Sequence, residues 1–250
     1  MGALLIRIVI SQPMFLPWRG MFEQLKLSDV FVFYDDVQLP KGGGKGRGFI
    51  TRVQIKTKTG WKWLSVPVDR SGKGYQLIKD VCFQNDDWRN RHLAAIKGAY
   101  ADTPFYNEIY ESLVVPIYEY KTKFLNEFSI NAIKKLSSYL GTIPRFYISS
   151  DLNISLEEDP SQRVLGICRR FKADEYITGH GARNYLNYEI FEKNNISVKY
   201  MEYKCTPYPQ LYGEFNPYVT ILDLLFNVGP ESYDLLDSDA VYWKEWKGVS

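Results

Sequence analysis

Residues 4–36, LLIRIVISQPMFLPWRGMFEQLKLSDVFVFYDD, give the clearest indication of the fold of this chain. It opens with a run rich in Ile and Val, which is typical of a strand, and two prolines then prevent an immediate helix. Apolar residues at helical spacing predict a short helix over 19–28. Residues 29–36 are apolar almost throughout, as in a strand buried on both faces of a parallel sheet. Together they form a βαβ unit, whose crossover should be right-handed.

The second half of the chain repeats this alternation of strands and helices. The predicted elements are a strand over 145–152, a helix over 159–171, a strand over 174–182, a helix over 184–196 and a strand over 197–203. Asp159 can cap the first of these helices, because Pro160 occupies the first helical position and Gln162 completes a capping box. We therefore predict an α/β fold with three layers around a mainly parallel, nucleotide-binding-like sheet, built from residues 1–70 and 145–229.

The alternation of strands and helices is interrupted between about residues 49 and 140. Two alternating runs, 49–57 and 61–68, are joined by the sequence KTG and predict a hairpin. Helices are predicted over 86–100 and over 116–140, and a further helix is predicted to start near Pro104. We interpret the chain as a single α/β domain over 1–250, in which about residues 85–140 form a helical cap.

The composition excludes several classes of protein. With 45% apolar and 24% charged residues, the chain resembles an ordinary soluble globular protein. A net charge of only +2 and one short basic stretch give no reason to expect nucleic acid as a partner. Three widely separated cysteines form no zinc-binding pattern and no disulfide framework, so we expect no metal site and a cytoplasmic protein. No run approaches the roughly 20 apolar residues of a membrane-spanning helix.

The loops that follow the predicted parallel strands are the best candidates for a functional site. Ligands of open α/β sheets bind beyond the carboxyl ends of the strands. Four loops leave such ends, namely SQPMFLPWRG (11–20), DDVQLPKGGG (35–44), SSDL (149–152) and TGHGARNY (178–185). If the strands are parallel, these loops should converge.

Polar and aromatic residues stand at these strand ends. Gln12 can donate and accept hydrogen bonds at once, and Trp18 could stack on a ligand or cover the core. Neighbouring strand residues point to opposite faces, so only one of Asp35 and Asp36 should face the cleft, and they are no acid–base pair. For Asp36, a proton-accepting role, helix capping, an ion pair and contact with a magnesium–phosphate ligand remain open. Ser150 is one of the hydroxyls that end the strand 145–152.

The segment KGGGKGRG, residues 41–48, combines glycines with cations. Glycines let backbone amides approach an anion, and Lys41 and Arg47 add positive charge that Arg52 extends. The segment is no P-loop, because no Gly-Lys-Ser/Thr opens a helix there. The alternatives are an anion-binding loop and an ordinary surface loop.

The chain has two histidines. His180 stands between glycines at a predicted strand end, where it could act as a general base on an amine or hydroxyl. His92 follows Trp88 by four residues on one helix face, and we interpret it as a structural histidine. No nucleophile elbow is present, and no cysteine is tied to a histidine by its spacing.

The chain resembles the WbqC-like proteins of bacterial surface-polysaccharide gene clusters. The resemblance rests on ordered blocks over about residues 5–229: QPMFLPWRGMFEQL, SDVFVFYDDVQLPKGG, GWKWLSVPV, ISSDL, GICRRFKADEYITGHGARNYL and YPQLYGEFNPYVTILDLLFNVG. The sequence departs from that family at Ser11, where relatives usually carry His, and at the turn containing His180, which usually includes Pro. The resemblance implies a role in O-antigen and lipopolysaccharide biosynthesis. Its first block is also similar in layout to folds that hold an adenylate beyond the first strand.

From the residues and the resemblance together we predict a transferase. It would pass an acyl or aminoacyl group, brought by an acyl- or aminoacyl-carrier, to the amine of a nucleotide-linked amino sugar, with His180 or Asp36 accepting the proton. Lys41, Arg47 and Arg52 would hold the pyrophosphate, and Trp18 or Tyr208 would contact the base or sugar. The acceptor pocket would include Gln210 and Asn227. The alternatives are an ATP- and magnesium-dependent ligase or nucleotidyltransferase, and a non-catalytic carbohydrate-binding or assembly protein.

Overall fold

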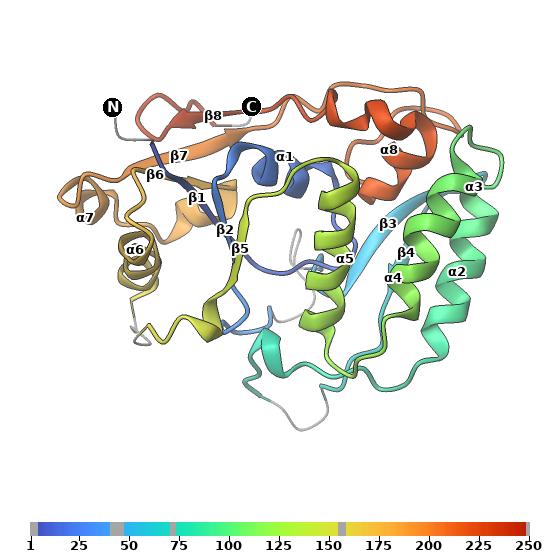
Figure 1. Cartoon of the computed structure of the whole chain (residues 1–250), viewed down its shortest axis with the longest axis horizontal. Coiled ribbons are helices and arrows are strands. Elements are labelled where there is room, and N and C mark those ends of the chain that lie inside the picture. Colours follow the sequence, from blue (N-terminus) through green and yellow to red (C-terminus); the bar gives the residue numbers. More distant parts are fainter. Residues whose placement is uncertain (1–4, 41–47, 71–73, 155–158, 249–250) are drawn as a thin grey trace.

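The computed structural model describes residues 5–40, 48–70, 74–154 and 159–248, and Figure 1 shows its arrangement. The strands are β1 (Arg7–Ser11), β2 (Val30–Phe33), β3 (Arg52–Thr57), β4 (Gly60–Ser65), β5 (Arg145–Ile148), β6 (Glu175–Thr178), β7 (Ser197–Glu202) and β8 (Asp239–Tyr242). The α-helices are α1 (Arg19–Leu27), α2 (Asp87–Tyr100), α3 (Tyr106–Ile109), α4 (Val115–Glu119), α5 (Leu125–Tyr139), α6 (Pro160–Arg170), α7 (Tyr188–Glu192) and α8 (Ile221–Val228).

Six of these strands form one sheet in the order β5-β2-β1-β6-β7-β8. Every neighbouring pair is parallel except β7 and β8, which are antiparallel. The chain winds outward from β1 through β2 to β5, and then returns to β6 on the other side of β1 and continues to β7. This confirms the predicted three-layer, mainly parallel α/β fold. The edge strand β8 lies beyond the segments that we predicted to build the sheet.

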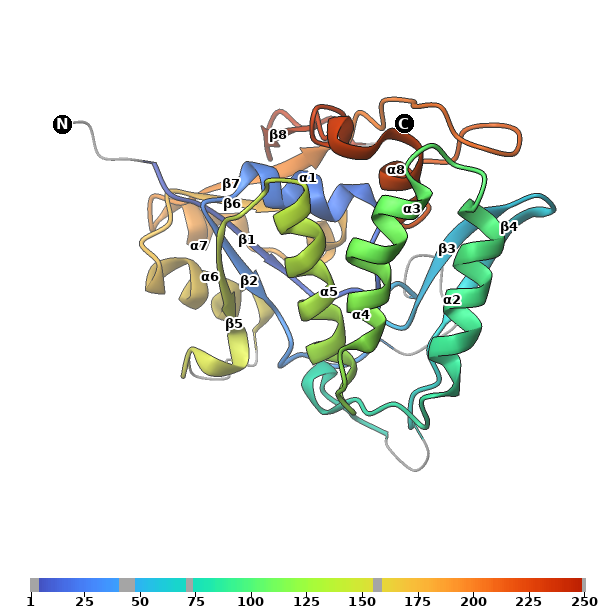
Figure 2. The ribbon, with the colours of Figure 1, turned by 45° about the vertical axis from the view of Figure 1, so that its right-hand side comes forward.

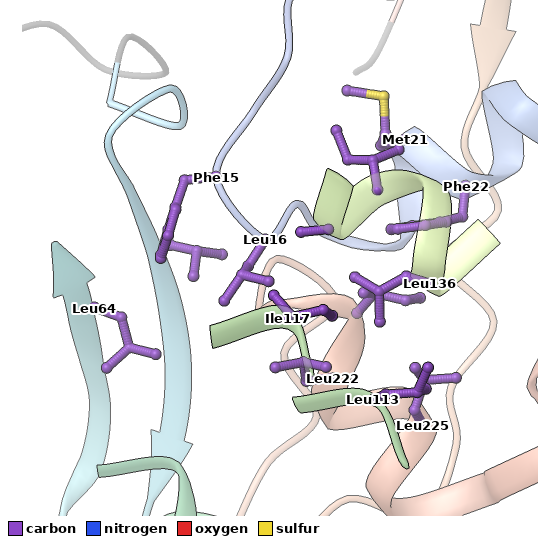
Figure 3. Packing of buried hydrophobic residues seen from close by; sticks show 14 of the residues in the cluster. Phe15, Leu16, Met21, Phe22, Leu64, Leu113, Ile117, Leu136, Leu222 and Leu225 are labelled. Carbon is purple, nitrogen blue, oxygen red and sulfur yellow. The ribbon is translucent and has the colours of Figure 1, made fainter. Parts of the chain in front are cut away.

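The two faces of the sheet bury two separate cores, because successive strand residues point to opposite sides. In β2, Phe31 enters the core shared with α1, α5 and α8, whereas Val32 enters the core beneath α6 and α7. Figure 2 shows α5 and α6 on opposite sides of β2 and β5. Figure 3 shows the first core, to which Phe22 of α1, Leu136 of α5 and Leu225 of α8 contribute.

The predicted hairpin of β3 and β4 is confirmed, but it forms a separate two-stranded antiparallel sheet, so this part of residues 1–70 does not join the main sheet as we predicted. Its inward side chains, among them Val53, Ile55 and Leu64, belong to the first core. Helix α2 packs on β3, α3 packs on α8, and α4 packs on α5. The helices within residues 85–140 therefore share the core of the main sheet and extend it sideways (Figure 2).

One predicted helix, 116–140, is wrong, because the structure divides it into α4 and α5. The backbone leaves the helix at Tyr120, which is extended. The next residues pair with the segment before α2, where Phe83 donates to the carbonyl of Lys123 and Leu125 donates to the carbonyl of Val81, both at 2.9 Å. These tertiary hydrogen bonds replace helical ones, and the apolar spacing of α5 alone did not reveal the interruption.

Candidate functional site

A cavity of about 910 Å³ lies beyond the carboxyl ends of β1, β2 and β6. The strand order reverses between β1 and β6, and open α/β sheets bind ligands at such a reversal. The volume falls within the range of about 300–1,000 Å³ that is usual for small-molecule sites. We call it the switch-point cavity. Its polar lining includes Ser11, Gln12, Gln24, Asp36, Arg163, Thr178 and His180.

Four of the predicted site residues meet in the wall of this cavity: Gln12, Trp18, Asp36 and His180. They come from the loops after β1, β2 and β6, which converge because the three strands are adjacent and parallel. The loop after β5 lies behind this wall, where the Ser149 hydroxyl is hydrogen-bonded to Asp35 and Asp36. The convergence of the strand-end loops is thus confirmed.

His180 is held by one ring nitrogen. It begins the short 3₁₀ helix His180–Asn184 directly after β6, and its Nε2 lies 2.7 Å from the carbonyl oxygen of Met201 in β7. A carbonyl can only accept a hydrogen bond, so Nε2 must carry the proton. The neutral ring then keeps its lone pair on Nδ1, and this is the nitrogen that can accept a proton from a substrate.

Asp36 forms a buried ion pair with Arg163 of α6. The other Asp36 oxygen accepts a hydrogen bond from the Ser149 hydroxyl at 2.5 Å. The side chain of Arg163 is only 6% exposed, and its guanidinium lies 5.9 Å from the ring centre of Tyr34. Because both Asp36 oxygens are engaged, Asp36 fixes Arg163 in the cavity wall and is poorly placed to take a proton from a ligand.

Asp35 and Ser150 lie behind this wall. The Asp35 carboxylate accepts hydrogen bonds from the Ser150 amide at 3.1 Å, from the Ser150 hydroxyl at 3.0 Å and from the Asn126 amide at 3.3 Å. Burial raises the pKa of Asp35, and the hydrogen bonds from Ser150 and Ser149 oppose that rise. Asp35 therefore anchors the loop after β5. Ser150, predicted to bind substrate, has this structural partner and does not line the cavity.

Aromatic rings also line the cavity. A Cβ atom at Gly20 would lie 2.4 Å from Cζ2 of Trp18, so the absence of a side chain at Gly20 is what lets the indole occupy its place. Trp18 contacts the ring of Tyr203 at a centroid distance of 4.9 Å. Gln24 of α1 donates to the Tyr203 hydroxyl at 2.7 Å. Tyr34 also lines the cavity, and burial raises its pKa to about 12, so it stays protonated at neutral pH.

Three predicted residues, Tyr208, Gln210 and Asn227, gather around buried Asp223 instead. Tyr208 and Gln210 donate to an Asp223 oxygen at 2.8 and 2.7 Å. Lys56 of β3 joins them through the side-chain oxygen of Gln210 at 2.8 Å. This network ties the hairpin to α8 and does not line the switch-point cavity, so we correct these assignments to a structural role.

Of the three predicted phosphate-binding residues, the structure describes one. Arg52 lies on the hairpin, with its guanidinium 4.3 Å from the ring centre of Trp63, and is not part of the cavity lining. Lys41 and Arg47 lie outside the described residues. Among the described residues, the Lys or Arg side chain that lines the cavity is Arg163.

Among the cavity residues that were not predicted from the sequence are Arg163, Tyr34, Gln24 and Tyr203. Tyr34 could have been predicted as a site residue, since it stands at the end of β2 directly before the two aspartates. Arg163 follows a confirmed N-cap, in which the Asp159 side chain accepts from the Gln162 amide at 2.9 Å. Nothing local distinguishes it from the other arginines of α6, because its ion-pair partner is 127 residues away.

Comparison with known proteins identifies the family. The model of the WbqC-like protein family matches residues 12–235. This chain belongs to the WbqC-like family. A relative from Mycobacterium tuberculosis (strain ATCC 25618 / H37Rv), named "Uncharacterized protein Rv1507c", is 35% identical to this WbqC-like protein over 235 residues, which cover 92% of this chain and 97% of the relative. No solved structure matches the chain.

Within the described parts of the WbqC-like chain, no three His, Cys, Asp or Glu side chains are grouped as a metal ion would need. In the same residues, none of the helices combines the length and the apolar character that crossing a bilayer requires.

Proposed function

We propose that this WbqC-like protein is a transferase that joins an acyl or aminoacyl group to the amine of a nucleotide-linked amino sugar in the cytoplasm, during O-antigen biosynthesis. The observation that carries the proposal is His180 in the wall of the switch-point cavity, with its proton fixed on Nε2 by the Met201 carbonyl. A base held in this way is suited to deprotonating a weak nucleophile as it attacks.

The reaction would need one base and no covalent intermediate on the protein. The lone pair of the neutral sugar amine attacks the carbonyl carbon of the activated donor, and the new C–N bond forms. His180 Nδ1 takes a proton from the nitrogen, and the same imidazolium then returns it to the leaving group of the carrier as the bond between carbonyl and carrier breaks. Protons and electrons balance without an oxidant or reductant.

The walls of the cavity support a nucleotide-linked substrate. Sheets with this strand order bind nucleotides at the reversal between strands. Arg163 lines the same cavity, where it pairs with Asp36, and a guanidinium is the side-chain group whose planar geometry suits phosphate. Lys41 and Arg47 remain the sequence-based candidates for further phosphate contacts. A ligase or nucleotidyltransferase that uses ATP would occupy the same position, and magnesium dependence with pyrophosphate release would distinguish it.

A thermal-shift screen tests the proposal first. The wild-type protein is heated with nucleotide sugars, with ATP and magnesium, and with acyl-CoA. A ligand at 100 times its dissociation constant should stabilise the fold by about 2.7 kcal/mol. We expect stabilisation by nucleotide-linked amino sugars. If no nucleotide or nucleotide sugar shifts the transition, the proposal is wrong.

The variant His180→Gln tests the role of the base. Glutamine can still donate to the Met201 carbonyl but cannot accept a proton at neutral pH. We expect nucleotide-sugar affinity within about twofold of wild type and a transfer rate lower by about 10²- to 10⁴-fold, the usual contribution of a general base. His180→Gln with an unchanged transfer rate would show that another group takes the proton.

A further inference from the structure

A second cavity, of about 610 Å³, adjoins the switch-point cavity. Trp18, His180 and Tyr203 line both cavities, so these three side chains stand at the boundary between them. The rest of the second lining comes from the end of β7, from the loop before α8 and from the chain after β8. We call it the annex. Because His180 is common to both, a ligand that extends from one cavity into the other passes the proposed base.

Five rings from five segments of the chain line the annex in a continuous series. Tyr218 contacts Trp18 at a centroid distance of 5.5 Å, and Trp18 contacts Tyr203 at 4.9 Å. Tyr203 contacts His180 at 5.5 Å, and His180 contacts Trp246 at 4.7 Å. Tyr218 is 55% exposed, so its ring is available to a ligand.

The segments that carry these rings are fixed by backbone hydrogen bonds. Trp18 forms a β-bridge with Thr220, and Ile221 donates to the carbonyl of Pro17 at 2.9 Å, which holds the loop after β1 against the loop that carries Tyr218. The amide of Trp246 donates to the carbonyl of Tyr242 in β8 at 3.0 Å. The rings therefore belong to the folded framework and form a preformed surface.

The rim of the annex is polar. Glu202, Glu245 and Lys247 line it beside the rings. A pyranose ring is complementary to this lining, because its C–H faces are apolar and its edges carry hydroxyls. Aromatic rings suit the faces, since Trp and Tyr offer large rigid apolar surfaces. Carboxylates and an ammonium suit the edges, since they accept and donate strong hydrogen bonds.

We propose that the annex is the sugar subsite, in which Trp246 and Tyr218 pack against the pyranose ring of a nucleotide-linked sugar. The inference rests on the proposed function. The nucleotide and its diphosphate lie in the switch-point cavity near Arg163, and the sugar passes His180 into the annex. This arrangement places a sugar amine at the boundary between the cavities, beside the proposed base.

The C-terminal wall of the annex lies outside the residues that the family model matches. The family match ends at residue 235, whereas Glu245, Trp246 and Lys247 lie beyond it. The switch-point cavity, in contrast, takes nearly all of its lining from matched residues.

Titration calorimetry with matched ligand pairs tests the subsite. The probes are UDP-, dTDP- and GDP-linked amino hexoses, each compared with its own nucleoside diphosphate. For the pair that wild type binds most tightly, Trp246→Ala and Tyr218→Ala should each weaken the nucleotide sugar by about tenfold, a ring-stacking contribution. Affinity for the nucleoside diphosphate should stay within about twofold. Trp246→Phe should recover most of the loss, because it restores a ring.

The control is Trp61→Ala, since Trp61 is 57% exposed on β4 and lines neither cavity. It should leave both affinities unchanged. If Tyr218→Ala weakens the nucleotide sugar and the nucleoside diphosphate equally, the rings contact the nucleotide base and the proposal is wrong. It is also wrong if both annex variants bind both ligands as tightly as wild type. If wild type binds the nucleoside diphosphate but gains nothing from the sugar, the subsite alone fails. If it binds no nucleotide at all, the proposed function fails with it.

Discussion

The two histidines of the chain show how surroundings set the role of a residue. His180 lies in a cavity wall with one nitrogen bonded to Met201, which leaves the other for chemistry. His92 of α2 is buried, with Nδ1 3.2 Å from the Tyr118 hydroxyl and Nε2 3.1 Å from the Ser65 carbonyl. Both nitrogens of His92 are engaged, which is consistent with the structural role that its helical position indicated.

His92 should make the stability of the protein depend on pH. Burial lowers its pKa from 6.5 to about 4, so the folded state resists protonation. The resulting contribution to the free energy of unfolding is fully present above pH 6.5. It is lost as the pH falls toward 4, because in that range the unfolded chain binds the proton and the folded chain does not. At 1.36 kcal/mol per pKa unit, this amounts to about 3 kcal/mol.

Urea unfolding of wild type and His92→Gln between pH 7 and 4 measures this effect. The stability difference between wild type and variant should shrink by about 3 kcal/mol over that range. The control Trp61→Ala keeps His92 and removes no titratable group, so it should retain the wild-type pH dependence. A difference between wild type and His92→Gln that stays constant from pH 7 to 4 would contradict the prediction.

At the scale of elements, helix ends are set partly by local chemistry and partly by neighbours. The start of α6 follows its local sequence, since Asp159 caps it as expected. The glycines after α5 and α8, Gly141 and Gly229, both adopt positive φ, at 74° and 66°. They differ in surroundings, because a Cβ at Gly141 would meet open space, whereas one at Gly229 would lie 2.4 Å from the ring of Phe105.

These two glycines form a matched pair for mutation. Gly141→Ala should lower the free energy of unfolding by about 1–2 kcal/mol, the cost of a positive φ with a Cβ. Gly229→Ala should lower it by at least about 2 kcal/mol more, because the Phe105 ring must also move. Chemical denaturation of both variants measures the difference. Equal losses would show that Phe105 yields freely.

At the scale of the whole molecule, the sheet joins two cores into one structure. The strands β1 and β2 contribute alternate side chains to the core of α1, α5 and α8 and to the core of α6 and α7. Neither core can lose its packing without exposing one face of the same strands. We therefore predict that residues 1–250 unfold as one domain.

One substitution in each core tests this prediction. Phe128 of α5 and Phe191 of α7 are fully buried in the two cores. Each change to Ala should cost about 3–5 kcal/mol and shift a single transition that near- and far-ultraviolet circular dichroism report together. An early separate transition in Phe191→Ala would instead show that the α6–α7 side unfolds independently.

The amino-acid sequence predicts the alternation of strands and helices, the hairpin, the α6 cap and the convergence of loops at one edge of the sheet. These features follow from side-chain periodicity and from short-range hydrogen bonds, which neighbouring residues record. Three features depend on contacts that the sequence did not reveal: Arg163 pairs with Asp36, Tyr208 and Gln210 donate hydrogen bonds to Asp223, and residues 120–124 interrupt a helix. In each case the deciding partner comes from a different part of the fold, and a hydrogen bond or ion pair between distant segments leaves no periodic trace in either one.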